Sequence, residues 1–457
     1  MRLAWGWMAA GVVVVAGAAA AAGLRAPLQT AAGLTAHNLC AAAFTQQVDP
    51  DATFRELVRP MIGPAGRLTH YRVDPAAKAV DASILGLVRA RAVYTEGFGC
   101  RLVIDPDRPS PAPVPPRAAS PADGFAPATL VAAPDPALKA ALDAIFTDPP
   151  GAAPRYVKAV VIVKDGKVVA ERYAPGFGVD TPLLSYSVAK SFTNAFLGVL
   201  AREGRLRMDA PVGAPEWAAP GDPRGKLTLD DLERMQSGLD ADETGSGFDP
   251  ASQMLYAHDD MAHFAADHPL RKPPRTEWRY TSANTLILDR AIGQAVGGGA
   301  AGLRQFADAQ VFQPTHMDGV TLEFDGAGTF SGSAHVYAPA RAFARLGLLY
   351  LNDGVAPDGR RILPEGWVAY SRRSTLGSSY GAGFWTNDGP SDDAAWRVAH
   401  GFPKDGFFAS GNRGQRIYII PSERMVVARF GYTGGESFDI AGDMRLIKAA
   451  IADLKGR

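Results

Sequence analysis

Ser187 and Lys190 stand three residues apart at the start of an apolar stretch, and this pair could support nucleophilic catalysis. The apolar residues that follow recur at helical intervals, so both polar side chains fall on one stripe of a predicted helix. A serine hydroxyl attacks a carbonyl well only when a base takes its proton, and a lysine one turn away can be that base. The first turn of a helix also presents free N–H groups that favour a developing oxyanion. The spacing therefore predicts a serine nucleophile with a lysine base.

Tyr280 is a second candidate for proton transfer, at the start of a polar segment that continues to Thr285. A phenol has an ordinary pKa of about 10, so it acts as a base near neutral pH only if that value is lowered. A neighbouring Lys190 ammonium would lower it, and the two groups would then share a proton as a coupled pair. The structural alternatives are a tyrosine packed at a helix start and, for Ser187 and Lys190, a capped surface helix with an ordinary lysine.

Four segments together resemble the superfamily of serine β-lactamases and penicillin-binding proteins, in its class C-like branch. The resemblance covers about residues 156–454, and its segments are Ser187 to Lys190, Leu232 to Leu239, Tyr280 to Thr285 and Ala409 to Gln415. It implies that Ser187 is acylated, that Lys190 is a base or proton relay, and that Tyr280 carries a proton to the leaving group. It also implies an oxyanion hole at a strand edge, for which the backbone amides of Ser187 and of Asn412, next to Gly411, are the candidates. Acyl-enzyme chemistry of this kind needs no metal and no organic cofactor.

Two positions depart from the pattern of that superfamily. The asparagine of its Tyr-x-Asn motif is replaced by Ser282, with Asn284 two residues further on, and its basic-Thr-Gly strand motif here reads Ala-Ser-Gly. Both departures resemble the amide-hydrolase and esterase members, notably the 6-aminohexanoate-dimer hydrolases. The resemblance therefore makes Ser282 and Asn284 candidates for substrate contacts. It also makes Trp385, in an aromatic run, a candidate wall of the pocket, with packing in the core as the alternative.

The elements that must position these residues are strands at both ends of the resembling region. Two β-branched runs, 156–164 and 167–172, are joined by Asp165-Gly166, a strong hairpin signal. Three further strands are expected within 407–430, and a closing helix over 439–454. An α+β fold of the β-lactamase/transpeptidase type follows, with one antiparallel sheet built from both chain ends, flanking helices and an inserted, mostly helical region.

The chain before this region divides by composition. Residues 1–25 contain an apolar run from Leu3 to Leu24, which predicts a cleaved signal peptide or a retained membrane anchor. Residues 26–104 form a small N-terminal extension, and 105–136 form a proline-rich linker or an extended surface strap. The serine hydrolase domain is expected to span 137–457.

Cys40 and Cys100 are the only two cysteines, and an exported chain would meet an oxidising compartment. We therefore expect a disulfide between them that staples the N-terminal extension, with two buried free thiols as the alternative. The expected location is periplasmic or secreted, with the inner membrane as a possible anchor through residues 3–24.

The residues and the resemblance predict an exported serine hydrolase that cleaves a small linear amide or ester through an acyl-enzyme on Ser187. A β-lactamase or D-Ala-D-Ala carboxypeptidase is the alternative within the superfamily, and a non-catalytic protein that binds peptidoglycan or another ligand is the alternative of a different class. The 47 basic residues balance the 47 acidic ones, which excludes the basic footprint of a nucleic-acid-binding protein. The substrate and the oligomeric state are left open by the sequence.

Overall fold

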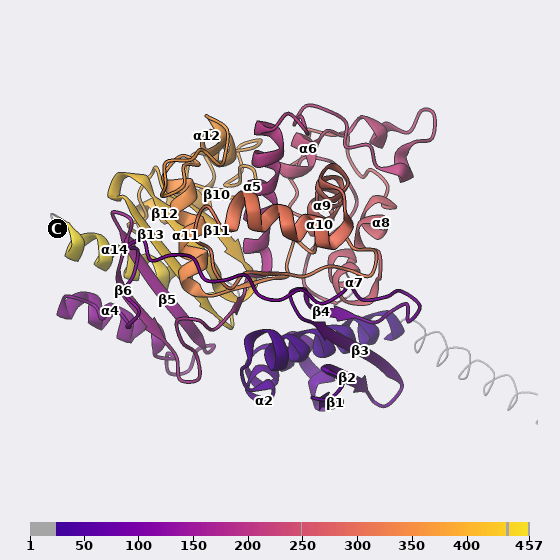
Figure 1. The fold of residues 1–457 in the computed structure, drawn as a ribbon, viewed down its shortest axis with the longest axis horizontal. Coiled ribbons are helices and arrows are strands. Elements are labelled where there is room, and N and C mark those ends of the chain that lie inside the picture. Colours follow the sequence, from indigo (N-terminus) through magenta and orange to yellow (C-terminus); the bar gives the residue numbers. More distant parts are fainter. Residues whose placement is uncertain (1–23, 248, 436–437, 456–457) are drawn as a thin grey trace, which may run out of the picture.

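A six-stranded antiparallel sheet forms the centre of the protein. The computed structural model describes residues 24–247, 249–435 and 438–455 (Figure 1). The strand order is β10-β11-β12-β13-β5-β6, so strands from both ends of the hydrolase region meet where β13 pairs with β5. This confirms the predicted sheet. Its strands are β5 (Val157–Lys164), β6 (Lys167–Tyr173), β10 (Trp385–Thr386), β11 (Phe407–Gly411), β12 (Gln415–Ile420) and β13 (Met425–Gly431).

Helices cover both faces of this sheet, which explains why β5 is an almost continuous apolar run rather than an alternating one. Val160 and Ile162 point to the face covered by α4 (Pro136–Phe146) and α14 (Ile440–Leu454). Val161 and Val163 belong to the main core on the opposite face. On that face lie α5 (Ala189–Arg202) and α11 (Ala340–Leu351), and α11 packs on β13, β12 and β5.

A mostly helical region is inserted between the two groups of strands, as predicted, and it lies beside the sheet (Figure 1). It also contains a small three-stranded sheet, β7-β9-β8. Besides α5 and α11, its principal elements are β7 (Leu183–Leu184), α6 (Leu229–Glu233), α7 (Pro250–Ala257), α8 (Met261–Ala266), α9 (Ser282–Val296), α10 (Gly299–Ala307), β8 (Thr321–Leu322), β9 (Val336–Ala338) and α12 (Trp367–Arg372). The helix α13 (Asp392–Ala399) comes later, between β10 and β11.

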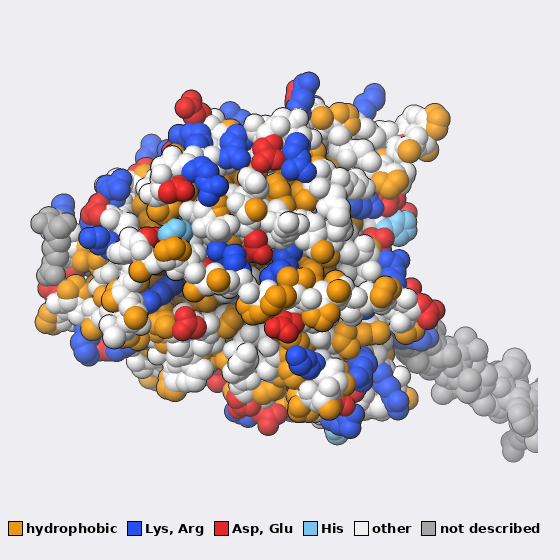
Figure 2. Space-filling view, in the orientation of Figure 1, with side chains coloured by type: hydrophobic (Ala, Val, Ile, Leu, Met, Phe, Trp, Pro, Cys, Tyr) orange, Lys and Arg blue, Asp and Glu red, His pale blue; other side chains and the backbone are white. Residues whose placement is uncertain are grey.

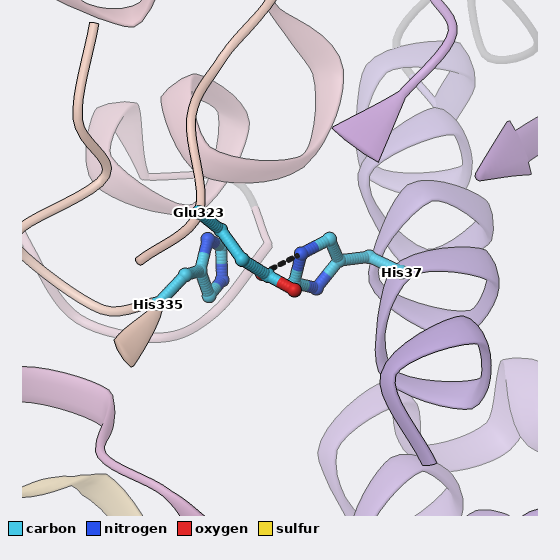
Figure 3. Close-up of side chains that lie close together, drawn as sticks. All are labelled: His37, Glu323 and His335. Carbon is cyan, nitrogen blue, oxygen red and sulfur yellow. Dashed lines mark hydrogen bonds and ion pairs between the residues drawn. The ribbon is translucent and has the colours of Figure 1, made fainter. Parts of the chain in front are cut away.

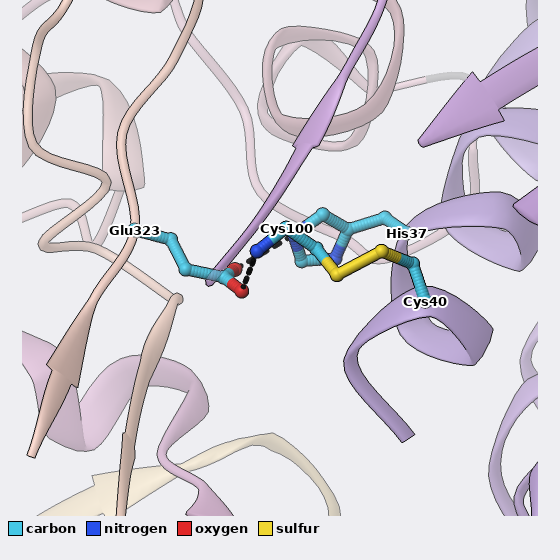
Figure 4. Close-up of a disulfide and its surroundings, with 4 residues drawn as sticks. All are labelled: His37, Cys40, Cys100 and Glu323. Atoms are coloured by element: carbon cyan, nitrogen blue, oxygen red, sulfur yellow. Dashed lines mark hydrogen bonds and ion pairs between the residues drawn. A yellow bond between two sulfur atoms is a disulfide. The ribbon is translucent and has the colours of Figure 1, made fainter. Parts of the chain in front are cut away.

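The residues from 24 to 102 form an N-terminal module with a four-stranded antiparallel sheet of its own. The module opens with a helix over 24–40, and Cys40 at its end forms a disulfide with Cys100 (Figure 4). The remaining elements are η1 (Ala41–Gln46), α2 (Pro50–Thr53), η2 (Phe54–Val58), α3 (Arg59–Ile62), η3 (Gly63–Arg67), β1 (Thr69–Asp74), β2 (Ala79–Ile84), β3 (Val88–Thr95) and β4 (Gly99–Leu102).

The predicted signal or anchor segment, Leu3 to Leu24, lies outside the described residues except for Leu24. Among the helices that the structure does describe, none combines the length and the apolar character needed to cross a membrane.

Buried polar contacts fix the module against the hydrolase region. His37 reaches from the N-terminal helix to Glu323, with Nε2 and Oε2 2.8 Å apart and both side chains buried (Figure 3). The other oxygen of Glu323 accepts the backbone N–H of Cys100 at 2.7 Å (Figure 4). The Glu323 carboxylate thus attaches both the N-terminal helix, which carries Cys40, and β4, which carries Cys100, to the hydrolase region. A buried apolar cluster continues across the same boundary and includes Tyr186 and Tyr256.

The proline-rich segment over 105–134 is the extended strap, and it runs along the hydrolase region. The carbonyl oxygens of Phe125 and Val131 accept the N–H groups of Val168 and Glu171 in the edge strand β6, each at 2.8 Å. One ion pair, between Asp123 and Arg345, adds to this attachment, and Arg341 of α11 donates to the backbone carbonyl of Pro127 at 2.9 Å.

Charged side chains of both signs are interspersed over the face seen in Figure 2. This distribution agrees with the balanced composition, and no extended basic stripe crosses that face.

The close packing of the N-terminal helix on α7 predicts the outcome of a glycine substitution. A β-carbon on Gly33 would lie 1.9 Å from the carbonyl oxygen of Tyr256, so Gly33→Ala should push the helix away and lower the free energy of unfolding by about 1–3 kcal/mol. Denaturant unfolding measures this loss. Gly293→Ala is the matched control, because Gly293 lies in α9 with open space beside it. Equal stability of the Gly33→Ala variant and the wild type would contradict the packing described.

Candidate active site

Ser187 lies in a short turn, η4 (Tyr186–Val188), that leads directly into α5. Ser185 fixes this turn against the backbone at the start of β9. Its hydroxyl accepts the Val336 N–H at 3.0 Å and donates to the Ala334 carbonyl at 3.1 Å. Tyr186 takes a left-handed φ of 42°, which is unfavourable for a large side chain and is kept by the buried packing of its ring. The turn thereby leaves Ser187 partly exposed at the start of the helix.

Lys190 is buried beside Ser187, on the same side of α5, as the spacing predicts. Its Nζ lies 3.3 Å from the hydroxyl oxygen of Ser187 and 3.0 Å from that of Ser282. A third contact, 3.2 Å to the carbonyl oxygen of Ser333, comes from the loop before β9 and has no signature in the sequence. The three oxygens satisfy the amine in a site from which water is largely excluded.

Tyr280 completes the group, because its hydroxyl hydrogen-bonds with both Ser187 and Lys190. The ring is stacked on Trp385, with centroids 5.7 Å apart and planes at 30°, and the edge-on ring of Tyr380 packs against it at 5.6 Å. Lys190 Nζ lies 4.7 Å from the ring centroid. The phenol oxygen is therefore fixed between the amine and the serine hydroxyl.

The expected lowering of the phenol pKa is wrong. Burial raises the pKa of Tyr280, and although the charge of Lys190 lowers it, the carboxylate of Glu243 raises it further, so the pKa lies above its ordinary value. The prediction took account of the charge of Lys190, but not of burial against the rings of Trp385 and Tyr380 or of the charge of Glu243. Tyr280 thus keeps its proton at neutral pH.

At Gly411 the edge of β11 contacts η4, the turn that carries Ser187 and is called the nucleophile turn below. A β-carbon at this position would lie 2.4 Å from the carbonyl oxygen of Ser185 and 3.0 Å from the amide nitrogen of Ser187, so only glycine allows this approach. Asn412 follows and lines the same pocket as Ser187. The strand edge therefore places the two amides expected to form an oxyanion hole, those of Ser187 and Asn412, at one site.

Asn284 and Trp385 lie behind the site. Asn284 is fully buried, and its Oδ1 accepts the hydroxyl of Ser237 at 2.8 Å. Trp385 supports the ring of Tyr280 and is not among the described residues that line the pocket around Ser187. Ser282, by contrast, lines the pocket as well as contacting Lys190.

Glu243 is a site residue that was not predicted from the sequence. It comes from the loop between α6 and α7, and its Oε2 accepts the backbone N–H of Ser282 at 2.5 Å, at the start of α9. A carboxylate at a helix N-terminus is a favourable placement, but the loop that delivers it has no periodic pattern. Only the folded structure brings Glu243 to the wall of the pocket.

A buried carboxyl group at the end of α6, that of Glu233, contacts α5 one turn beyond Lys190. Asn194 donates from Nδ2 to Oε1 of Glu233 at 3.0 Å, while its Oδ1 accepts from Trp367 Nε1 at 2.9 Å. Burial raises the pKa of Glu233 to about 7. Ser187, Lys190 and Asn194 therefore continue as one polar stripe that leads from the surface to a carboxyl group in the core.

The pocket in front of Ser187 has a volume of about 410 Å³, which lies within the range of small-molecule sites. Around the nucleophile it is lined by Tyr186, Glu243, Ser282, Ser333, Ala334 and Asn412. Glu243 is the one charged side chain among the described lining residues.

Comparison with known proteins identifies the family of the chain. The beta-lactamase family model matches residues 142–450. The chain is 31% identical over 268 residues to the 6-aminohexanoate-dimer hydrolase of Paenarthrobacter ureafaciens, a match that covers 53% of this chain and 66% of that protein, just under two thirds of its length. It is 26% identical over 283 residues to penicillin-binding protein 4 of Amycolatopsis lactamdurans, covering 54% of this chain and 71% of that protein.

Similarity to a solved structure supports the fold of this chain but says nothing of its activity. A penicillin-binding protein homolog from Caulobacter crescentus superposes with a TM-score of 0.53 at 20% identity, over 71% of this chain and 99% of that one. The N-terminal module over 24–102 and most of the strap precede the residues that the family model matches.

The raised pKa of Glu233 predicts a pH-dependent stability. Between pH 4.5 and about 7 the carboxyl group ionises in the unfolded chain but stays neutral in the folded one, so stability falls as pH rises, by about 3 kcal/mol in total. Glu233→Gln cannot ionise and should lack this decline. Denaturant unfolding of both proteins at pH 5 and pH 8 measures the difference, with the exposed Glu365→Gln as control. Parallel pH dependence in all three proteins would contradict the assignment.

Proposed function

This chain belongs to the beta-lactamase family, and from that premise we propose that it is a serine hydrolase that cleaves a small amide or ester through an acyl-enzyme on Ser187. One observation carries the proposal. Ser187, Lys190 and Tyr280 are hydrogen-bonded to one another beside a strand edge that Gly411 brings against the nucleophile turn. A serine nucleophile, a proton relay and backbone donors for an oxyanion are the parts that acyl transfer needs.

In acylation, Ser187 Oγ attacks the substrate carbonyl carbon while its proton passes to Lys190, 3.3 Å away. Because burial raises the pKa of Tyr280, the phenol keeps its proton in the resting site, and Lys190 must give up a proton before it can accept this one. Tyr280 donates its proton to the departing amine or alcohol and recovers one from Lys190. The amides of Ser187 and Asn412 hold the negative carbonyl oxygen meanwhile.

Deacylation uses the same groups in the opposite direction. Water attacks the ester carbonyl of the acyl-enzyme and loses a proton to the Lys190–Tyr280 pair. The relay then returns a proton to Ser187 Oγ as the bond to the acyl group breaks and the carboxylic acid leaves. No other group from the chain is required for the proton balance.

Charge in the pocket disfavours an anionic amide or ester. Glu243 repels a substrate carboxylate, and the strand motif Ala409-Ser410-Gly411 supplies no basic side chain to hold one. The 31% identity to a 6-aminohexanoate-dimer hydrolase supports an amide substrate. A β-lactam or D-Ala-terminated peptide is the second candidate, favoured by the match to a penicillin-binding protein.

We also propose that the protein acts after export. The disulfide between Cys40 and Cys100 and the apolar run over residues 3–24 support this proposal. Periplasmic or secreted protein, with or without a retained anchor, would fit both features.

The role of Ser187 predicts the effect of its removal. Ser187→Ala should lower kcat/KM by more than about 10³-fold on whichever of p-nitrophenyl acetate, a linear 6-aminohexanoate dimer and nitrocefin is turned over. It should also abolish labelling by a fluorophosphonate, detected by mass spectrometry. The exposed Ser110→Ala is the matched control. Undiminished turnover in Ser187→Ala, or neither turnover nor labelling in the wild type, would favour a ligand-binding protein.

The raised pKa of Tyr280 predicts the direction of the pH profile. The active form has lost one proton from the Lys190–Tyr280 pair, and because the phenol pKa lies above its ordinary value, kcat/KM for an ester should rise with pH across the neutral and alkaline range. Tyr280→Phe keeps the stacking on Trp385 but removes the relay, and should lower kcat/KM by about 10²–10⁴-fold and change this profile. A wild-type optimum in acid would contradict the proposed mechanism.

A further inference from the structure

The N-terminal module supplies the far wall of the pocket in front of Ser187. Ten of the twenty-four described residues that line this pocket lie at positions 24–65, outside the part of the chain that the family model matches. Leu24, Pro27, Leu28, Ala31 and Leu34 recur at helical spacing along the N-terminal helix and form one apolar stripe. Met61 and Ile62 of α3 continue this wall.

This wall is fixed in position relative to the nucleophile. Tyr186, the residue before Ser187, donates its hydroxyl to the sulfur of Met61 at 3.2 Å. The helix is anchored further along by the buried His37–Glu323 pair, by the disulfide and by the contact of Gly33 with Tyr256. The apolar stripe is therefore a built part of the site.

The apolar wall faces the same pocket as the groups that would form the acyl-enzyme. The pocket is lined by Ser187 and Asn412, which attack and hold the carbonyl, whereas Tyr280, which protonates the leaving group, is not among its described lining residues. A leaving group directed at Tyr280 would leave the acyl part of the substrate to extend toward the N-terminal helix. Glu243, the one charge in the described lining, disfavours a carboxylate there.

We propose that the pocket between the N-terminal module and Ser187 binds an uncharged hydrocarbon chain, so that the substrates are esters or amides of medium-chain fatty acids. This inference rests on the proposed function. Each methylene group transferred into the apolar pocket contributes to binding, and about a fourfold gain in kcat/KM per methylene is expected while the chain still fits.

The test measures kcat/KM for p-nitrophenyl acetate, butyrate, hexanoate and octanoate. The wild type should show a steep rise along the series. Ala31→Phe fills the pocket and Leu28→Asn makes its wall polar, so each should lower the octanoate-to-acetate ratio of kcat/KM by about tenfold or more. Leu87→Asn is the matched control, since Leu87 is 81% exposed in the same module and lies away from the pocket lining. Far-UV circular dichroism establishes that the variants fold.

The outcomes separate this inference from the proposed function. A flat chain-length profile, or ratios in Ala31→Phe and Leu28→Asn equal to that of Leu87→Asn, would overturn the acyl-chain pocket while leaving Ser187 chemistry intact. Loss of all turnover in Ser187→Ala without any chain-length effect in the wild type would overturn it in the same way. If esters are not turned over, the rate at which alkyl fluorophosphonates of increasing chain length label Ser187 replaces kcat/KM, and a flat series overturns the inference.

Discussion

The contacts of the buried Lys190 amine are the constraint on which the active site depends. An amine removed from water needs polar partners, and this one finds them in three separate parts of the chain. The hydroxyl of Ser187 is on the nucleophile turn, that of Ser282 begins α9, and the carbonyl of Ser333 precedes β9. The inserted helical region and the small sheet must both be docked on α5 before the amine is satisfied. Assembly of the catalytic group is thereby linked to completion of the fold.

The polar stripe along α5 places several groups that are costly to bury inside the core. Asn194 is fully buried and bonded on both ends of its amide, and Glu233 beyond it is neutral below about pH 7. Asp289, on α9, is buried nearby with its pKa raised by burial, although Thr193 and the Gly332 N–H bond its oxygens. A core with this many titratable groups is held together by matched donors and acceptors as much as by apolar packing.

Features that depend on local spacing could be predicted from the sequence. The three-residue interval between Ser187 and Lys190 is enough to place both on one helix stripe, and the β-branched runs around Asp165-Gly166 are enough for the central hairpin. The position of Tyr280 followed from the resemblance to the family.

Features that depend on packing between distant segments could not be predicted. Asn284 looks like a substrate contact in its motif, but the register of α9 turns it toward Ser237. Glu243 and the carbonyl of Ser333 arrive on loops without periodicity. The pKa of Tyr280 depends on aromatic rings and a carboxylate from segments far apart in the chain, so the sign of its shift could not be read from Lys190 alone.

The strap and the shortness of β10 together leave the central sheet with little free edge. A sheet edge with unpaired N–H and C=O groups is a template on which other chains can add strands. At one edge β10 offers only two residues, and at the other the carbonyls of Phe125 and Val131 already occupy N–H groups of β6. Proline within the strap cannot itself donate to a further strand. The proline-rich segment therefore covers the one edge of the sheet that is long enough to accept a further strand.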